Sequence, residues 1–101
     1  MSRRRRRGKL PDSLRLYFWE VDFDQVSWAK NFGYIVRRLL EHGTLEVVEW
    51  LRAEIGDDAI RDEITRVKAR GLDYERVRRW IPRATYDAWA AGRPPSLWEH
   101  R

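Results

Sequence analysis

The sequence predicts an all-α protein: a single small domain of about five helices with a helix-turn-helix-like core. Apolar residues recur at steps of three and four in several segments, which is the spacing of an amphipathic helix. No segment alternates apolar and polar residues as a half-buried strand does. Gly56 alone separates helical patterns over residues 44–55 and 57–70, and so short a turn holds two helices at a fixed angle, as in a helix-turn-helix.

The two helices that flank Gly56 carry their own start and stop signals. Thr44 and Asp57 begin them with side-chain oxygens that can accept a hydrogen bond from an unpaired N–H of the first turn. Gly56 and Gly71 end them, because glycine takes the left-handed cap without a Cβ penalty. A tight pair of helices of this kind favours binding over catalysis.

The remaining elements follow from the same spacing and from the positions of glycine and proline. In chain order they are a short helix beginning near residue 12, a packed aromatic and acidic loop over 18–24, a helix over 28–41, a helix over 74–81 and a short turn over 85–91. Asp24 or Ser27 is expected to cap the third of these elements, and Asp73 the fourth. The predicted regions are a basic arm (1–9), a helical domain (10–91) and an extended, proline-containing tail (92–101).

Charge is distributed unevenly along the 101 residues, whose net charge is +5. Residues 1–9 carry six basic groups and no acidic one, residues 10–59 five basic and ten acidic, and residues 60–83 eight basic and four acidic. The molecule therefore has an acidic middle between basic ends, which indicates more about its partners than the net value does.

Clustered cations are the electrostatic signature of nucleic-acid binding. The predicted contacts are Arg3, Arg4, Arg5, Arg6, Arg7, Lys9, Arg66, Lys68, Arg70, Arg76, Arg78, Arg79 and Arg83. The arm could lie in an A·T-rich minor groove, or its attraction could be to polyanions in general. The helix over 57–70 fits badly as a recognition helix, because Asp57, Asp58 and Asp62 near its N-terminus repel phosphate. Basic residues on an exposed helix are also often only a solvated face.

A partner protein is the other predicted ligand. The acidic middle suits a partner with a basic surface, and tryptophan is a frequent anchor of protein interfaces. The predicted partner-binding residues are Asp22, Asp24, Glu46, Glu49, Trp89 and Trp98. The other four tryptophans, Trp19, Trp28, Trp50 and Trp80, are expected to lie mostly in the core.

Catalysis has little support in the sequence. There is no cysteine, no Walker loop and no dinucleotide-binding turn, and the only histidines are His42 and His100. We therefore predict that the protein is not an enzyme and needs no metal or cofactor. No apolar run approaches the ~20 residues that cross a bilayer, so a cytoplasmic location without membrane contact is expected.

Several short motifs, in a fixed order, resemble a small bacterial domain family of unknown function. They are LPDSL (10–14), FW (18–19), DFD (22–24), IVRRLLEHG (35–43), WL (50–51) and GDDAIR (56–61). Members of the family are often encoded beside AbiEii-type nucleotidyltransferase toxins. The resemblance covers about residues 10–81 and brings no catalytic residues with it.

The resemblance implies an antitoxin-like or regulatory protein of a toxin–antitoxin or phage-defence module. Its acidic, tryptophan-bearing middle would engage a nucleotidyltransferase-type partner while its basic ends contact DNA or RNA. Two alternatives stay open. One is a stand-alone DNA- or RNA-binding protein, either a transcription factor or a ribosome-associated protein, and the other is a small structural subunit.

Overall fold

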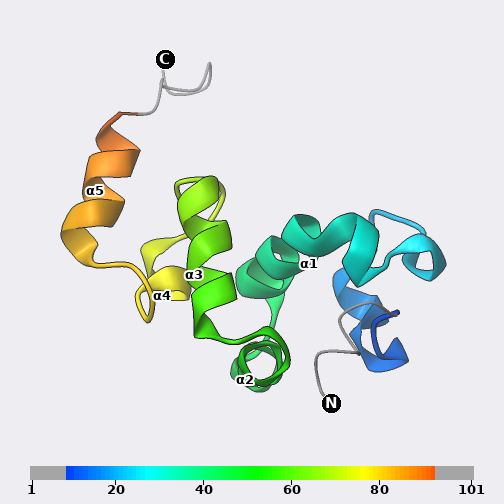
Figure 1. Ribbon diagram of the computed structural model, residues 1–101. Helices are drawn as coiled ribbons and strands as arrows, with labels where there is room; N and C mark the ends of the chain where they lie inside the picture. The colour runs from blue at the N-terminus through cyan, green and yellow to red at the C-terminus, as the bar shows by residue number, and fades with distance from the viewer. Residues whose placement is uncertain (1–8, 93–101) are drawn as a thin grey trace.

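The computed structural model describes residues 9–92, and these residues form helices joined by short connections (Figure 1). The elements are the 3-10 helices η2 (Asp12–Tyr17) and η3 (Phe23–Gln25) and the α-helices α1 (Trp28–His42), α2 (Leu45–Ile55), α3 (Asp57–Arg66), α4 (Tyr74–Val77) and α5 (Arg83–Ala91). Residues 9–92 contain no strand beyond one isolated antiparallel bridge between Lys9 and Ser27. The predicted all-α class is confirmed.

Helix α1 begins at Ser27, whose Oγ accepts a hydrogen bond from the Lys30 N–H at 3.4 Å. Of the two predicted caps, Ser27 is therefore the one used, and Asp24 pairs with Arg15 instead. Asn31 departs from helical geometry (φ −129°, ψ 29°), and its Oδ1 accepts the Ser27 N–H at 3.0 Å. This contact bends the first turn of α1.

The turn between α2 and α3 is the single residue Gly56, with φ of +87°, a left-handed conformation that glycine adopts without a Cβ penalty. Thr44 caps α2 as predicted, its Oγ1 accepting the Val47 N–H at 3.2 Å. Asp57 does not cap α3, because the cap position belongs to Gly56. The Asp57 carboxylate is occupied elsewhere, by the guanidinium of Arg52 and the indole N–H of Trp80.

Helix α3 ends at Arg66, four residues earlier than predicted. Lys68 and Ala69 have positive φ values of 52° and 56°, and residues in this left-handed region cannot continue a right-handed helix. The turn places Ala69 in the core with no exposed surface. Helix α4 is likewise shorter than predicted, and Asp73 makes no side-chain hydrogen bond to cap it.

The core lies where α1, α2 and α3 meet, and α1 contacts both of the other two helices. Its largest fully buried side chains are Phe18, Ile35, Val36, Leu39, Leu40, Leu51, Ile60, Ile64 and Val77. Trp28 and Trp80 are buried and Trp50 is half-buried, as expected, but Trp19 is 61% exposed. The prediction of a core position was wrong for Trp19, because its neighbour Phe18 fills the core in its place.

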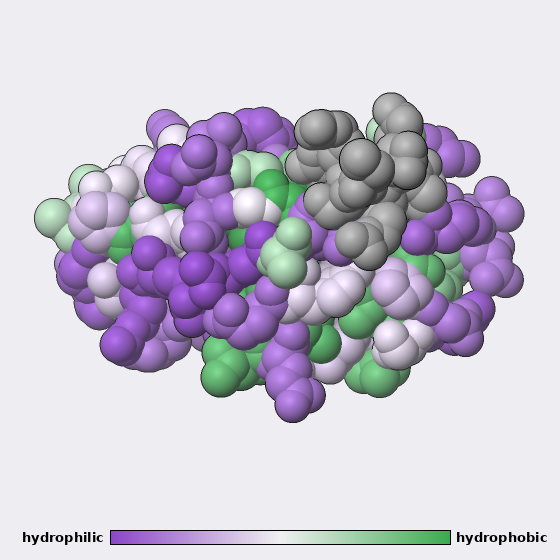
Figure 2. Space-filling view, turned by 60° about the horizontal axis from the view of Figure 1, so that its bottom comes forward, coloured by the Kyte–Doolittle hydropathy of each residue, from purple (hydrophilic) through white to green (hydrophobic). Residues whose placement is uncertain are grey.

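The face in Figure 2 is mostly hydrophilic, with apolar residues in small separate areas. None of the helices within residues 9–92 combines the length and the apolar character needed to cross a bilayer. The elements η2 and η3 lie at one end of the molecule and α5 at the other (Figure 1). The two ends therefore present distinct surfaces.

Candidate nucleic-acid interface

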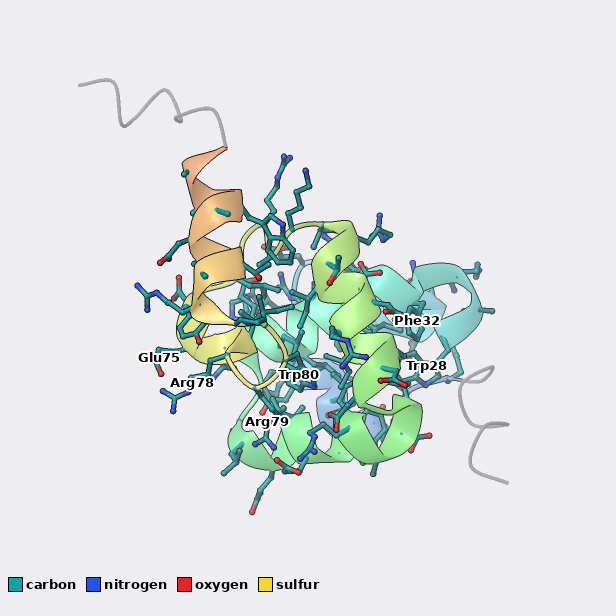
Figure 3. All side chains as sticks on the ribbon, turned by 60° about the vertical axis from the view of Figure 1, so that its left-hand side comes forward. Trp28, Phe32, Glu75, Arg78, Arg79 and Trp80 are labelled. Atoms are coloured by element: carbon teal, nitrogen blue, oxygen red, sulfur yellow. The ribbon has the colours of Figure 1, made fainter. Side chains whose placement is uncertain are left out.

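A pocket of about 670 Å³ lies between α5 and the C-terminal end of α3, and it opens to solvent. Figure 3 shows α5 beside this end of α3, with side chains in the space between them. The lining residues are Arg37, Arg66, Val67, Lys68, Arg70, Ala88, Trp89 and Gly92. Four are basic and none is acidic, and we call this site the basic pocket.

The wall that α5 forms is held by aromatic contacts at the start of that helix. Tyr86 donates its hydroxyl hydrogen to the Leu72 carbonyl at 2.7 Å, and its ring meets the ring of Tyr74 edge-on, with centroids 5.4 Å apart. The guanidinium of Arg83 lies 4.8 Å from the centre of the Tyr74 ring. These contacts fix α5 against the domain and so place Trp89, one turn further along, at the pocket.

A carboxylate below the pocket orients two of its cations. Glu63 is 7% exposed and accepts two hydrogen bonds from Arg66, at 3.0 and 2.6 Å, while the Arg37 Nε lies 3.2 Å from the same carboxylate. The two positively charged guanidinium groups offset the free-energy cost of burying the negatively charged carboxylate. Arg37 and Arg66 are therefore positioned before any ligand arrives.

Gly33 makes room for this arrangement. A Cβ at Gly33 would lie 2.7 Å from the Glu63 Oε2 and 3.2 Å from the Arg66 Nη2. The side chain of Glu63 thus occupies the space that any other residue at position 33 would need. Hydrogen bonding to Glu63 raises the pKa of Arg66 further above its ordinary value, at which an arginine is already charged at physiological pH.

The other two cations, Lys68 and Arg70, come from the turn after α3. The left-handed backbone at Lys68 costs of order 1 kcal/mol or more for a residue with a Cβ. Arg70 forms no ion pair with any residue in the range 9–92. A strained turn that carries a cation to a pocket rim is the kind of feature found at binding sites.

Only three of the predicted nucleic-acid-binding residues, Arg66, Lys68 and Arg70, line this pocket. Four others form contacts within the protein: Arg76 with the carbonyls of Leu40 and Gly43, Arg78 with Glu75, Arg79 with Glu49, and Arg83 with Asp87. Arg76 is thus a structural residue that satisfies carbonyls at the end of α1. Lys9 lies at the isolated bridge, and Arg3 to Arg7 lie outside the described residues.

The structure does not bring the predicted partner-binding residues together. Asp22 accepts a hydrogen bond from the Asp24 N–H, and the Asp24 carboxylate pairs with Arg15. On α2, Glu46 is exposed and Glu49 pairs with Arg52 and Arg79. Trp89 lies half-buried at the basic pocket, and Trp98 lies outside the described residues. Trp89 therefore belongs with the cations of the basic pocket, at the opposite end of the molecule from Asp22 and Asp24 (Figure 1).

Sequence reasoning missed two members of the site, Arg37 and Glu63. Arg37 lies off the apolar stripe of its helix, as solvated residues do, so its position alone carries no signal. Gly33, an isolated glycine inside a helical pattern, was the available signal, because such a glycine often marks close packing. It could not indicate which side chain approaches it.

The fold and the pocket define a small all-α protein with a basic, tryptophan-containing pocket. The chain belongs to DUF6922, a family of unknown function, whose family pattern matches residues 14–64. The match runs from η2 to near the end of α3. Comparisons with curated proteins and with solved structures find no significant match.

Proposed function

We propose that this protein binds nucleic acid through the basic pocket. The observation that carries the proposal is the convergence of four cations from α1, α3 and the following turn beside Trp89 of α5, at a pocket that no carboxylate lines. Phosphate contacts from Arg and Lys supply most of the affinity for nucleic acid, and aromatic side chains add stacking. The site supplies both.

The proposed contact does not use α3 as a major-groove reader. Recognition helices approach base edges with their N-terminal residues, and in α3 these include Asp57, Asp58 and Asp62. The Asp57 carboxylate is held by Arg52 and Trp80, which keep its pKa well below its ordinary value, so it stays negative. Nucleic acid is therefore approached by the C-terminal end of α3.

A second candidate function is an antitoxin-like or regulatory role, in which a separate surface binds a nucleotidyltransferase-type partner. The observation that favours it is Trp19, which is 61% exposed yet fixed in place. The guanidinium of Arg38 lies 4.1 Å from the centre of one of its rings, and the His42 ring is 4.9 Å away. An exposed, immobilised tryptophan is a frequent anchor of protein interfaces. Glu20 and Asp22, both exposed, favour a partner with a basic surface.

Fluorescence anisotropy of labelled nucleic acid over a salt series tests the first function. We compare the full chain with a Lys68→Ala/Arg70→Ala variant and with an Arg61→Ala/Arg78→Ala control. The control removes the same charge from exposed positions that pair with Asp58 and Glu75, and Figure 3 shows Arg78 directed away from the molecule.

We expect the pocket variant to bind at least tenfold more weakly than the full chain. Because it loses two phosphate contacts, the magnitude of its slope of log K against log salt should fall by about 1.8 on duplex or about 1.4 on single strands. The control should change affinity less than twofold. Equal losses in the two variants would reduce binding to net charge and refute a specific site.

Co-purification with a co-expressed AbiEii-type nucleotidyltransferase tests the second function. Trp19→Ala should abolish the complex, while Leu45→Ala, which removes an exposed leucine that is 69% accessible on α2, should leave it intact. A complex that survives Trp19→Ala would contradict the assignment of this surface.

A further inference from the structure

The geometry of the basic pocket points to an unpaired nucleotide as its ligand, with Trp89 as the platform on which the base stacks. This inference rests on the proposed nucleic-acid binding and specifies the form of the nucleic acid: a single-stranded segment, loop or end of RNA or DNA. The base would enter the pocket, and its flanking phosphates would lie on the cations of the rim.

The size of the pocket supports a base together with its phosphate. At about 670 Å³ it falls in the range of about 300–1,000 Å³ typical of sites for small organic ligands. Contacts that only follow the phosphates of a duplex need a basic surface, and they leave such a hollow unfilled. A pocket of this volume has room for a base as well as an anion.

Trp89 is suited to stacking because it is both packed and accessible. It is half-buried, packs against the hydrophobic core from α5, and is one of the residues that line the pocket. The two lining residues that accompany Trp89 at this end of the chain, Ala88 of α5 and Gly92 just after it, are small. No long side chain of α5 therefore competes with a base for the space beside the indole.

Base pairing decides between the two forms of nucleic acid. In a duplex each base is covered by its neighbours, so an indole reaches its face only if the base is unstacked, at a cost of a few kcal/mol. In a single strand the face is available, and stacking is worth about 5- to 150-fold in affinity for each base. A site that depends on Trp89 therefore prefers unpaired nucleotides.

The cations are arranged for the flanking phosphates. Arg37 and Arg66 are held by Glu63, and Lys68 and Arg70 come from the turn that follows α3. Arg70, without an ion-pair partner among the described residues, has its full hydrogen-bonding capacity for a phosphate. Cations from α1, α3 and the following turn, beside an aromatic side chain, suit the phosphates that flank one stacked base.

The test is anisotropy with labelled 10-nucleotide thymidine and uridine strands, a duplex of matched length, and a thymidine strand with several abasic positions. Wild type should bind the single strands at least tenfold more tightly than the duplex. The abasic strand keeps its phosphates but lacks those bases, so it should bind about tenfold more weakly than the intact strand. The difference between thymidine and uridine strands identifies DNA or RNA as the source of the nucleotide.

Trp89→Leu and Trp89→Phe complete the test, with Leu16→Ala, which removes an exposed apolar side chain of η2, as the control at the other end of the molecule. Trp89→Leu should lose about tenfold on intact single strands and change less than twofold on the duplex and on the abasic strand. Trp89→Phe should retain most of the affinity, and Leu16→Ala all of it. If Trp89→Leu fails to fold by circular dichroism, the wild-type comparison of intact and abasic strands decides alone.

Two failures are distinguishable. Equal binding of intact and abasic strands that still requires Lys68 and Arg70 would overturn the unpaired-nucleotide inference and leave the proposed function standing. Binding to every strand that is unaffected by Lys68→Ala/Arg70→Ala would overturn both.

Discussion

Substituting Gly33 by alanine should destabilise this protein, although glycine-to-alanine changes inside helices usually stabilise a protein. A glycine in an exposed helix interior costs about 1 kcal/mol relative to alanine, so propensity alone predicts a gain. Here the new Cβ would lie 2.7 Å from the Glu63 Oε2. The carboxylate must then move by roughly 0.7 Å or more to reach an ordinary contact distance.

The magnitude follows from what that movement breaks. Glu63 is buried, and its carboxylate is hydrogen-bonded to Arg66 at 2.6 and 3.0 Å and lies 3.2 Å from Arg37. Overpacking of this kind costs about 1–3 kcal/mol, and the solvent exposure of Arg66 moderates the loss of its bonds. With the propensity gain of about 1 kcal/mol set against it, we expect a net loss of up to about 2 kcal/mol, and each kcal/mol lost lowers the Tm by roughly 4–8 °C.

Urea denaturation followed by circular dichroism measures this difference, and Glu63→Ala supplies the control background. Once the carboxylate is absent the Cβ meets no obstacle there, so Gly33→Ala should stabilise the Glu63→Ala protein by up to about 1 kcal/mol. A change of sign between the two backgrounds is the result that the structure requires. If Gly33→Ala stabilised both proteins, the packing of Glu63 against α1 would be refuted.

Two further predictions concern groups outside the pocket. Arg76→Ala should destabilise the protein by about 1–3 kcal/mol, because it removes the side-chain donor of two carbonyls at the end of α1. Arg78→Ala, at an exposed ion pair, should change the stability by no more than about 0.5 kcal/mol. Thermal melts compare the two variants, and equal losses would contradict the structural role of Arg76. Asp57 has a lowered pKa, so its stabilising effect is present above its unfolded pKa of about 4 and is lost as the pH falls toward the folded value. The stability difference between wild type and Asp57→Asn should therefore be largest near pH 6 and shrink below pH 4 in urea titrations, and a difference independent of pH would argue against the ion pair with Arg52.

Much of the fold could be predicted from local sequence. The ends of α1 and of the two helices around Gly56 were predicted to within one or two residues, except the C-terminal end of α3. Helix periodicity and caps such as Thr44 and Ser27 are properties of neighbouring residues, so local sequence is enough to predict them. Asp57 is an exception. Its side chain is of the type that caps helices, but the carboxylate is held by Trp80, 23 residues away in sequence.

The basic pocket was only half predictable. Sequence alone determined the helical class, the charge asymmetry and three of the cations, Arg66, Lys68 and Arg70, since these depend on residue type and order. Only the tertiary structure decided that Trp89 lies beside these cations and that Glu63 of α3 orients Arg37 of α1. Those placements depend on the direction in which α5 leaves the domain and on the left-handed turn at Lys68 and Ala69. Both are set by packing between segments distant in sequence, which no local pattern records.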